Sequence, residues 1–128
     1  MSKARTYLLT FAAIAAMSLP AASVAQVASV VPYDEKLMRL SEVLGSIHYL
    51  RNLCGETSNE WRDQMQQMLA VENPEPLRRA RLIASFNRGY RTFDSVYESC
   101  TEQALEAANR YVKEGLALTR EINSRYGE

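Results

Sequence analysis

The 128-residue chain is poor in the residues that most metal and redox sites require, because it has one histidine and two cysteines. Cys54 and Cys100 are too far apart in sequence for a C-x-x-C motif, so a thioredoxin-like or zinc-binding function has little support. An excess of one charge is also absent. Fifteen basic residues balance fifteen acidic ones, which argues against a general nucleic-acid-binding protein. We therefore expect no metal, no cofactor and no nucleic-acid partner.

The chain also lacks an apolar run long enough to span a bilayer as a helix. Its apolar run at residues 7–19 follows the basic residues Lys3 and Arg5 and ends at Pro20. This order, with small residues before Gln26, is typical of a secretory signal that is cleaved before Gln26; cleavage at Ala28 is the alternative. The layout predicts export and no transmembrane segment after cleavage.

Cleavage would leave about one hundred residues, which suits one domain with a modest core. The remaining chain would carry thirteen basic and fifteen acidic residues, because the leader contributes only Lys3 and Arg5. In an oxidising compartment such as the periplasm, the two cysteines are expected to form a disulfide between Cys54 and Cys100. The predicted organisation is a signal peptide at residues 1–25, a flexible leader at residues 26–33 and a single helical domain at residues 34–126.

Apolar residues recur at three- and four-residue steps, which predicts an all-α fold. The first such segment covers residues 34–54 and the second, shorter one residues 61–71. From Leu77 one phase continues to about residue 125 without a proline, so one long, curved helix is favoured over two helices meeting near residues 99–102. The prediction is a small helical bundle of three to four helices with a long C-terminal helix and one disulfide.

A second apolar stripe is present only in the later half of that long segment, at Leu105, Val112 and Leu116. Two covers for this stripe remain open: the first helix packed antiparallel to it, or a second subunit, which would make a homodimer. The first helix can alternatively lie beside the earlier half of the segment.

The segment from residue 77 to residue 93 contains five arginines and no acidic residue, and four of the arginines are predicted to point away from the core. Arginine forks bind carboxylates and phosphates bidentately, so this face is the best candidate for binding an acidic partner or an anionic envelope component. The alternative is a solvated face balanced by acids of the preceding helix. The candidate binding residues are Arg78, Arg81, Arg88 and Arg91.

Two polar residues fall within or beside the apolar stripe of the first helix. Arg51 lies within it, so we expect a buried ion pair with Asp94 or Glu98, or a contact with Thr101. Alternatively, the stem of Arg51 is buried and its charged end is solvated. His48 lies at the edge of the stripe, where a lone histidine is usually structural, and no paired nucleophile or second metal ligand has a suitable spacing.

The C-terminal half of the chain carries a series of short motifs. They are N-R-G-Y-R at residues 87–91, F-x3-Y-x2-C-T at 93–101, R-Y at 110–111, E-G at 114–115 and R-Y-G at 125–127. With its cysteine pair, the chain resembles a family of small exported proteins of Gram-negative bacteria that are known only as conserved hypothetical proteins with a domain of unknown function. The resemblance implies a periplasmic setting and no activity, so it assigns no catalytic residue.

The leading hypothesis is a non-enzymatic periplasmic accessory or interaction protein that binds its partner through the arginine-rich helix face at Arg78, Arg81, Arg88 and Arg91. A regulator or enzyme of the cell envelope is the alternative, which would need His48 with a nearby carboxylate such as Glu42 or Glu98. A structural homodimer formed through the long helix is the third hypothesis.

Overall fold

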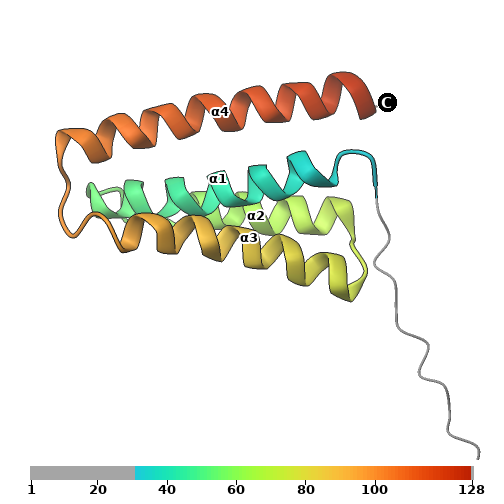
Figure 1. The fold of residues 1–128 in the computed structure, drawn as a ribbon, viewed down its shortest axis with the longest axis horizontal. Coiled ribbons are helices and arrows are strands. Elements are labelled where there is room, and N and C mark those ends of the chain that lie inside the picture. Colours follow the sequence, from blue (N-terminus) through green and yellow to red (C-terminus); the bar gives the residue numbers. More distant parts are fainter. Residues whose placement is uncertain (1–30, 128) are drawn as a thin grey trace, which may run out of the picture.

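The structure, a computed structural model, describes residues 31–127 and shows four helices in up-down-up-down order (Figure 1). They are α1 (Asp34–Leu53), α2 (Glu60–Glu72), α3 (Pro76–Asp94) and α4 (Glu102–Tyr126). The predicted all-α bundle, its long C-terminal helix and its disulfide are confirmed. The predicted signal peptide and residues 26–30 of the predicted leader lie outside the described residues.

α1 lies at the centre of the bundle, because each of the other three helices packs against it and α3 does so most extensively. α1 runs parallel to α3 and antiparallel to α2 and α4 (Figure 1). Residues 43–48 of α1 are all buried, as a central position requires. The sequence left two arrangements open for the first helix, either beside the earlier half of the C-terminal segment or antiparallel to its later half. α1 has both, because it lies beside α3 and also packs antiparallel to α4 (Figure 1).

The apolar core has two parts. The larger part joins α1, α2 and α3 through six buried side chains: Leu37, Leu44, Met65, Leu69, Leu82 and Phe86. The other part joins α1 to α4, where Leu50 packs against Ala104, Ala107 and Ala108. Because alanine side chains are small, they allow the backbone of α4 to lie close to α1.

The predicted single helix from Leu77 to residue 125 is wrong, because α3 ends at Asp94 and α4 begins at Glu102. The hydroxyl of Thr101 accepts a hydrogen bond of 3.1 Å from the backbone N–H of Ala104 and caps α4. The connection is seven residues long, which is close to two helical turns, so the apolar phase continues across the break. The structure has the alternative arrangement, in which two helices meet near residues 99–102.

The disulfide joins the end of α1 to the α3–α4 connection. Its sulfurs are 2.06 Å apart, and the Cα atoms of Cys54 and Cys100 are 4.8 Å apart. In the same connection, the backbone carbonyl of Tyr97 accepts a hydrogen bond from the hydroxyl of Tyr49. Two separate contacts therefore fix the chain between α3 and α4 to α1.

At the opposite end of the bundle, Tyr33 lies between α2 and α4. Its ring centroid is 5.2 Å from that of Tyr126, and its hydroxyl donates a 3.2 Å hydrogen bond to Glu72. The last residue of the predicted flexible leader is thus held against the folded domain. Within residues 31–127, every helix is too short or too polar to cross a membrane.

Candidate functional site

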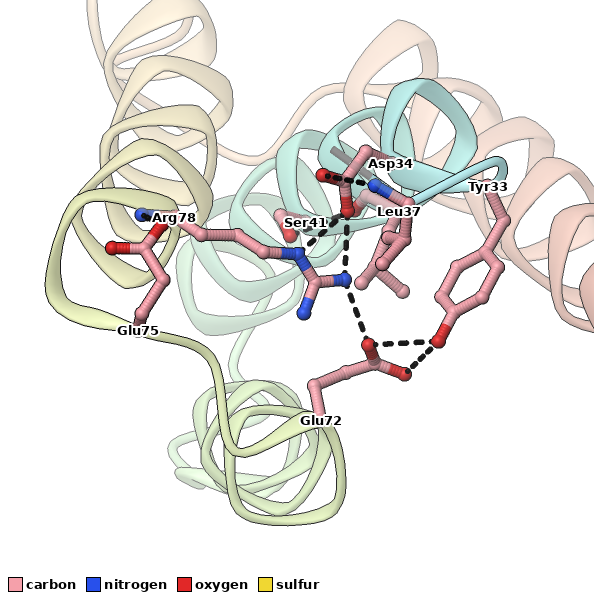
Figure 2. A network of polar contacts seen from close by, with 8 residues as sticks. Tyr33, Asp34, Leu37, Ser41, Glu72, Glu75 and Arg78 are labelled. Carbon is pink, nitrogen blue, oxygen red and sulfur yellow. Dashed lines mark hydrogen bonds and ion pairs between the residues drawn. The ribbon is translucent and has the colours of Figure 1, made fainter. Parts of the chain in front are cut away.

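Arg78 was predicted to bind a partner at the surface, but it is a buried residue with only 6% of its surface exposed. Figure 2 shows its guanidinium between two carboxylates from other helices. Nε and Nη2 each lie 2.7 Å from Oδ1 of Asp34, and Nη2 lies 2.8 Å from Oε2 of Glu72. The prediction for Arg78 is wrong because its side chain points toward the N-terminal turn of α1, where its charge is used to connect three helices.

The local sequence places Arg78 for this contact. The Glu75 side chain accepts hydrogen bonds of 2.9 Å from the backbone N–H groups of Leu77 and Arg78, which fixes the first turn of α3. Burial, the largest single cause, lowers the pKa of Arg78, but the hydrogen bonds to Asp34 and Glu72 and the charges of these two carboxylates together outweigh it, so the pKa is raised. Arg78 is therefore permanently charged and structural.

The remaining predicted arginines, Arg81, Arg88 and Arg91, are exposed on one side of α3. They share a side because their spacings of seven and three residues are close to whole helical turns. Arg88 forms a 3.0 Å ion pair with Glu42, and its side chain is still 60% exposed. Within residues 31–127, Arg81 and Arg91 have no ion pair. We call these three residues the arginine face.

The arginine face borders a shallow depression on α3, whose lining includes Ala84, Asn87 and Thr92 together with Arg88 and Arg91. Among the residues that the structure describes, no carboxylate lines this depression. An anionic group placed there would meet two guanidinium groups and two polar side chains, and it would compete with Glu42 for Arg88. This combination suits a carboxylate or a phosphate.

A second charged group, which the sequence analysis did not single out, joins the arginine face to α4. Arg39 of α1 forms two hydrogen bonds with Glu114, of 2.6 Å and 3.0 Å, and its guanidinium lies 5.6 Å from the ring centroid of Tyr111. The hydrogen bonds to Glu114 are the main reason why the pKa of Arg39 is raised. Glu42 lies 3.4 Å from Arg39 and also binds Arg88, so the group spans α1, α3 and α4.

The predicted buried ion pair of Arg51 with Asp94 or Glu98 is wrong, because Arg51 has other partners. Arg51 instead lies 3.6 Å from Glu56 and donates a 3.2 Å hydrogen bond to Asn109 of α4. Its side chain is partly exposed. The alternative, in which the stem is buried and the charged end reaches solvent, describes its position better.

His48 is buried, with 8% of its surface exposed, at the junction of α1, α2 and α3. Its Nδ1 atom lies 3.3 Å from the amide nitrogen of Asn52. Burial is the main reason why the pKa of His48 is lowered, and the charge of Arg62 acts in the same direction. Within residues 31–127, neither Glu42 nor Glu98 forms an ion pair with His48. The carboxylate pairing that the enzyme hypothesis would need is therefore absent there.

The predicted dimer stripe lies along one edge of α4. Leu105 is 43% exposed and Leu116 is 57% exposed. Val112 and Leu116 form one wall of a groove between α4 and α2, and Trp61 of α2 lines the opposite side. Leu40, Leu44 and Ile47 of α1 form the floor. α1 thus covers the stripe in part and leaves its outer edge open.

These features define a class of protein: a small four-helix bundle with a central first helix, a disulfide from the end of that helix to the α3–α4 connection, and an arginine face on α3. Within that class, the chain belongs to the family described as "Protein of unknown function (DUF2385)", which matches residues 32–126. Comparison with curated proteins and with solved structures found no match. The resemblance to an uncharacterised family is therefore confirmed, and the description of the family names no activity.

Proposed function

We propose that this protein is a non-enzymatic accessory protein of the periplasm that binds an acidic partner or an anionic envelope component through the arginine face. The observation that carries the proposal is the exposure of Arg81 and Arg91 without an ion pair in the described part of the chain. Free guanidinium groups on a rigid helix can bind carboxylates or phosphates bidentately, with little loss of backbone freedom. Arg88 contributes to the same binding surface, because its side chain is largely exposed although it is also paired with Glu42.

The periplasmic setting has separate support. A basic start followed by a short apolar run is typical of a secretory signal, and a disulfide is stable in an oxidising compartment. Mass measurement of the native protein tests this part. We expect cleavage before Gln26 and a mass lower by the two thiol hydrogens. A retained leader with both thiols reduced would contradict the periplasmic setting.

Charge reversal tests the binding surface. We expect the double variant Arg81→Glu and Arg91→Glu to reduce binding to phosphatidylglycerol vesicles, or capture of an acidic protein from envelope extracts, by at least about tenfold. Arg88 is left unchanged because its reversal would also place two acids together at Glu42. The matched control, Arg110→Glu with Arg120→Glu, changes two exposed residues of α4 by the same charge.

The control variant should bind as well as the unmodified protein. Added salt should weaken the binding of the control variant and of the unmodified protein alike. Equal binding by the α3 and α4 variants would contradict the proposal. Vesicles of phosphatidylcholine provide the uncharged surface, which we expect not to bind. Binding to phosphatidylglycerol alone would identify a lipid component, whereas capture of one acidic protein would identify a protein partner.

The exposed leucines of α4 favour a homodimer as a second candidate. Leu105 and Leu116 belong to one edge of the helix, and together they place apolar surface in contact with water. Sedimentation equilibrium tests this candidate. We expect a dimer that Leu116→Lys converts to a monomer without unfolding. A monomer at all protein concentrations would contradict it and would leave the arginine face unaffected.

A further inference from the structure

A pocket of about 310 Å³ opens between α2 and α3, and none of its lining residues belongs to the arginine face. Its floor is formed by the buried residues His48, Met65 and Phe86. Ile83 and Tyr90 line its exposed edge. The volume is at the lower end of the range of about 300–1,000 Å³ that is usual for small-molecule sites.

The hydrogen bonds around His48 fix which of its ring nitrogens carries the proton. Oδ1 of Asn52 accepts a 3.3 Å hydrogen bond from the backbone N–H of Ser58, so the amide nitrogen of Asn52 is the end that faces His48. That nitrogen donates to Nδ1 of His48 at 3.3 Å. Nδ1 is then an acceptor, and the neutral imidazole carries its proton on Nε2.

His48 is mainly neutral near pH 7, because burial and then the charge of Arg62 lower its pKa, while Asp63 acts in the opposite direction. The imidazole therefore offers one N–H group, at Nε2, to a ligand in the pocket. Asn52 holds the ring from the other side. A side chain that is buried, neutral and fixed in one tautomer is a typical orienting group of a small-molecule site.

The other polar groups of the pocket come from α2 and α3. They are the guanidinium of Arg62, the amides of Gln66 and Asn87, and the hydroxyl of Tyr90. No carboxylate lines the pocket, and Arg62 has no ion pair within residues 31–127. An anion in this position would accept hydrogen bonds from a guanidinium and an imidazole N–H, and the nearby Asp63 lies outside the lining of the pocket.

We propose that this pocket binds a small organic anion, in which a carboxylate or phosphate group is attached to an aromatic or short apolar body. The anionic group accepts hydrogen bonds from Arg62 and from Nε2 of His48. The apolar body packs against Ile83, Phe86 and the ring of Tyr90. The pocket and the depression beside the arginine face share Asn87, but their arginines differ, so either proposal can fail without the other.

Titration of the purified, disulfide-bonded protein, followed by ¹H–¹⁵N NMR, tests the site with three probes of similar shape. Phenylacetate carries a carboxylate, phenyl phosphate carries a phosphate and 2-phenylethanol carries no charge. We expect saturable shifts of the side-chain amide signals of Gln66 and Asn87 with at least one anionic probe. The uncharged probe should bind at least about tenfold more weakly, because it lacks the charge-assisted hydrogen bonds.

Two variants keep the proposal falsifiable. Arg62→Gln should weaken binding of the anionic probe by about tenfold, whereas Arg120→Gln, an exposed residue of α4, should leave it unchanged. Ile83→Trp should fill the pocket and abolish binding without lowering the thermal midpoint, because Ile83 lies at the exposed edge. The proposal is overturned if neither anionic probe saturates, if 2-phenylethanol binds equally well, or if both arginine variants weaken binding alike.

Discussion

Arg78 lies where the first turns of α1 and α3 meet the last turn of α2. Its positive charge is shared by Asp34 and Glu72, which are themselves mostly buried, and Tyr33 donates to Glu72 from the far side (Figure 2). A buried ion group of this kind contributes little in comparison with an apolar replacement. Removal of one member is costly, because the remaining charges are left without a partner.

Replacement of Arg78 by glutamine should therefore lower the free energy of unfolding by about 3 kcal/mol, the lower end of the usual range, because the two carboxylates retain some contact with water. Urea denaturation measures the change. Arg79→Gln removes the same charge from the neighbouring exposed position and should change the free energy by less than about 0.5 kcal/mol. Similar losses in the two variants would show that the ion group does not support the fold.

His48 gives the stability a specific pH dependence. Because its pKa is lowered in the folded protein, the unfolded chain binds a proton first as the pH falls. The contribution of His48 to stability should be fully present above the ordinary pKa of 6.5 and should decrease as the pH falls from 6.5 toward the folded pKa. His48→Gln should remove this decrease. Unfolding curves between pH 5 and pH 7.5 measure it, and an NMR titration that placed the folded pKa at or above 6.5 would contradict it.

The residue types of the charged groups could be read from the sequence, but their partners could not. Helical periodicity placed Arg51 correctly beside the core of α1, but it placed Arg78 among the exposed arginines, and Arg78 is buried. Periodicity does not give the residues that other helices bring to either arginine. Asp34 is forty-four residues from Arg78, and Asn109 is fifty-eight residues from Arg51. These pairings depend on how the helices cross, which a single periodic pattern does not contain.

At the scale of the helices, α1 and α3 approach each other through small residues. A Cβ atom at Gly45 would overlap the backbone carbonyl of Phe86, and one at Gly89 would overlap that of Glu42. A buried serine lies four residues before each glycine, at Ser41 and Ser85. Each glycine lowers the helix propensity of its segment. This loss is offset by packing, because only glycine permits such a close contact between the backbones of α1 and α3.

Gly89→Ala should lower the free energy of unfolding by about 2 kcal/mol, because the overlap with a backbone carbonyl forces α1 and α3 apart. Gly115→Ala is the matched control on α4. Its Cβ would lie 3.3 Å from Cγ1 of Val43, a side chain that can shift slightly, so the gain in helix propensity of up to about 1 kcal/mol should offset the contact. Thermal unfolding of the two variants measures the difference, and equal midpoints would exclude a special role for Gly89.

The break between α3 and α4 shows why helix boundaries were harder to predict than helix positions. A connection of seven residues preserves the apolar phase, so periodicity alone favoured one continuous helix. Thr101 followed by Glu102 is an N-terminal signal that was available, because threonine caps helices and acids favour the first turn. The capping residue was thus a better guide to this boundary than the absence of proline.

At the scale of the molecule, α4 packs mainly on α1 (Figure 1). Its contacts with the rest of the bundle include three alanines, Ile122 at the edge of the larger core, and surface ion pairs. Lys36 lies 3.0 Å from Glu121, and Arg39 binds Glu114. Exposed ion pairs of this kind contribute about 0–1 kcal/mol each, so they do not by themselves hold a helix of twenty-five residues in place.

The disulfide should therefore be the main attachment of α4 at its N-terminal end. It closes a loop with a sequence separation of forty-six residues, and the chain-entropy relation gives a stabilisation of about 4 kcal/mol for a loop of this length. Cys54→Ser with Cys100→Ser should lower the free energy of unfolding by about that amount, as measured by urea denaturation. Because α3 shares a larger core with α1 and α2, amide hydrogen exchange should increase in α4 before it increases in α3. A loss below about 1 kcal/mol, or equal exchange in both helices, would mean that the alanine contacts with Leu50 are sufficient to hold α4.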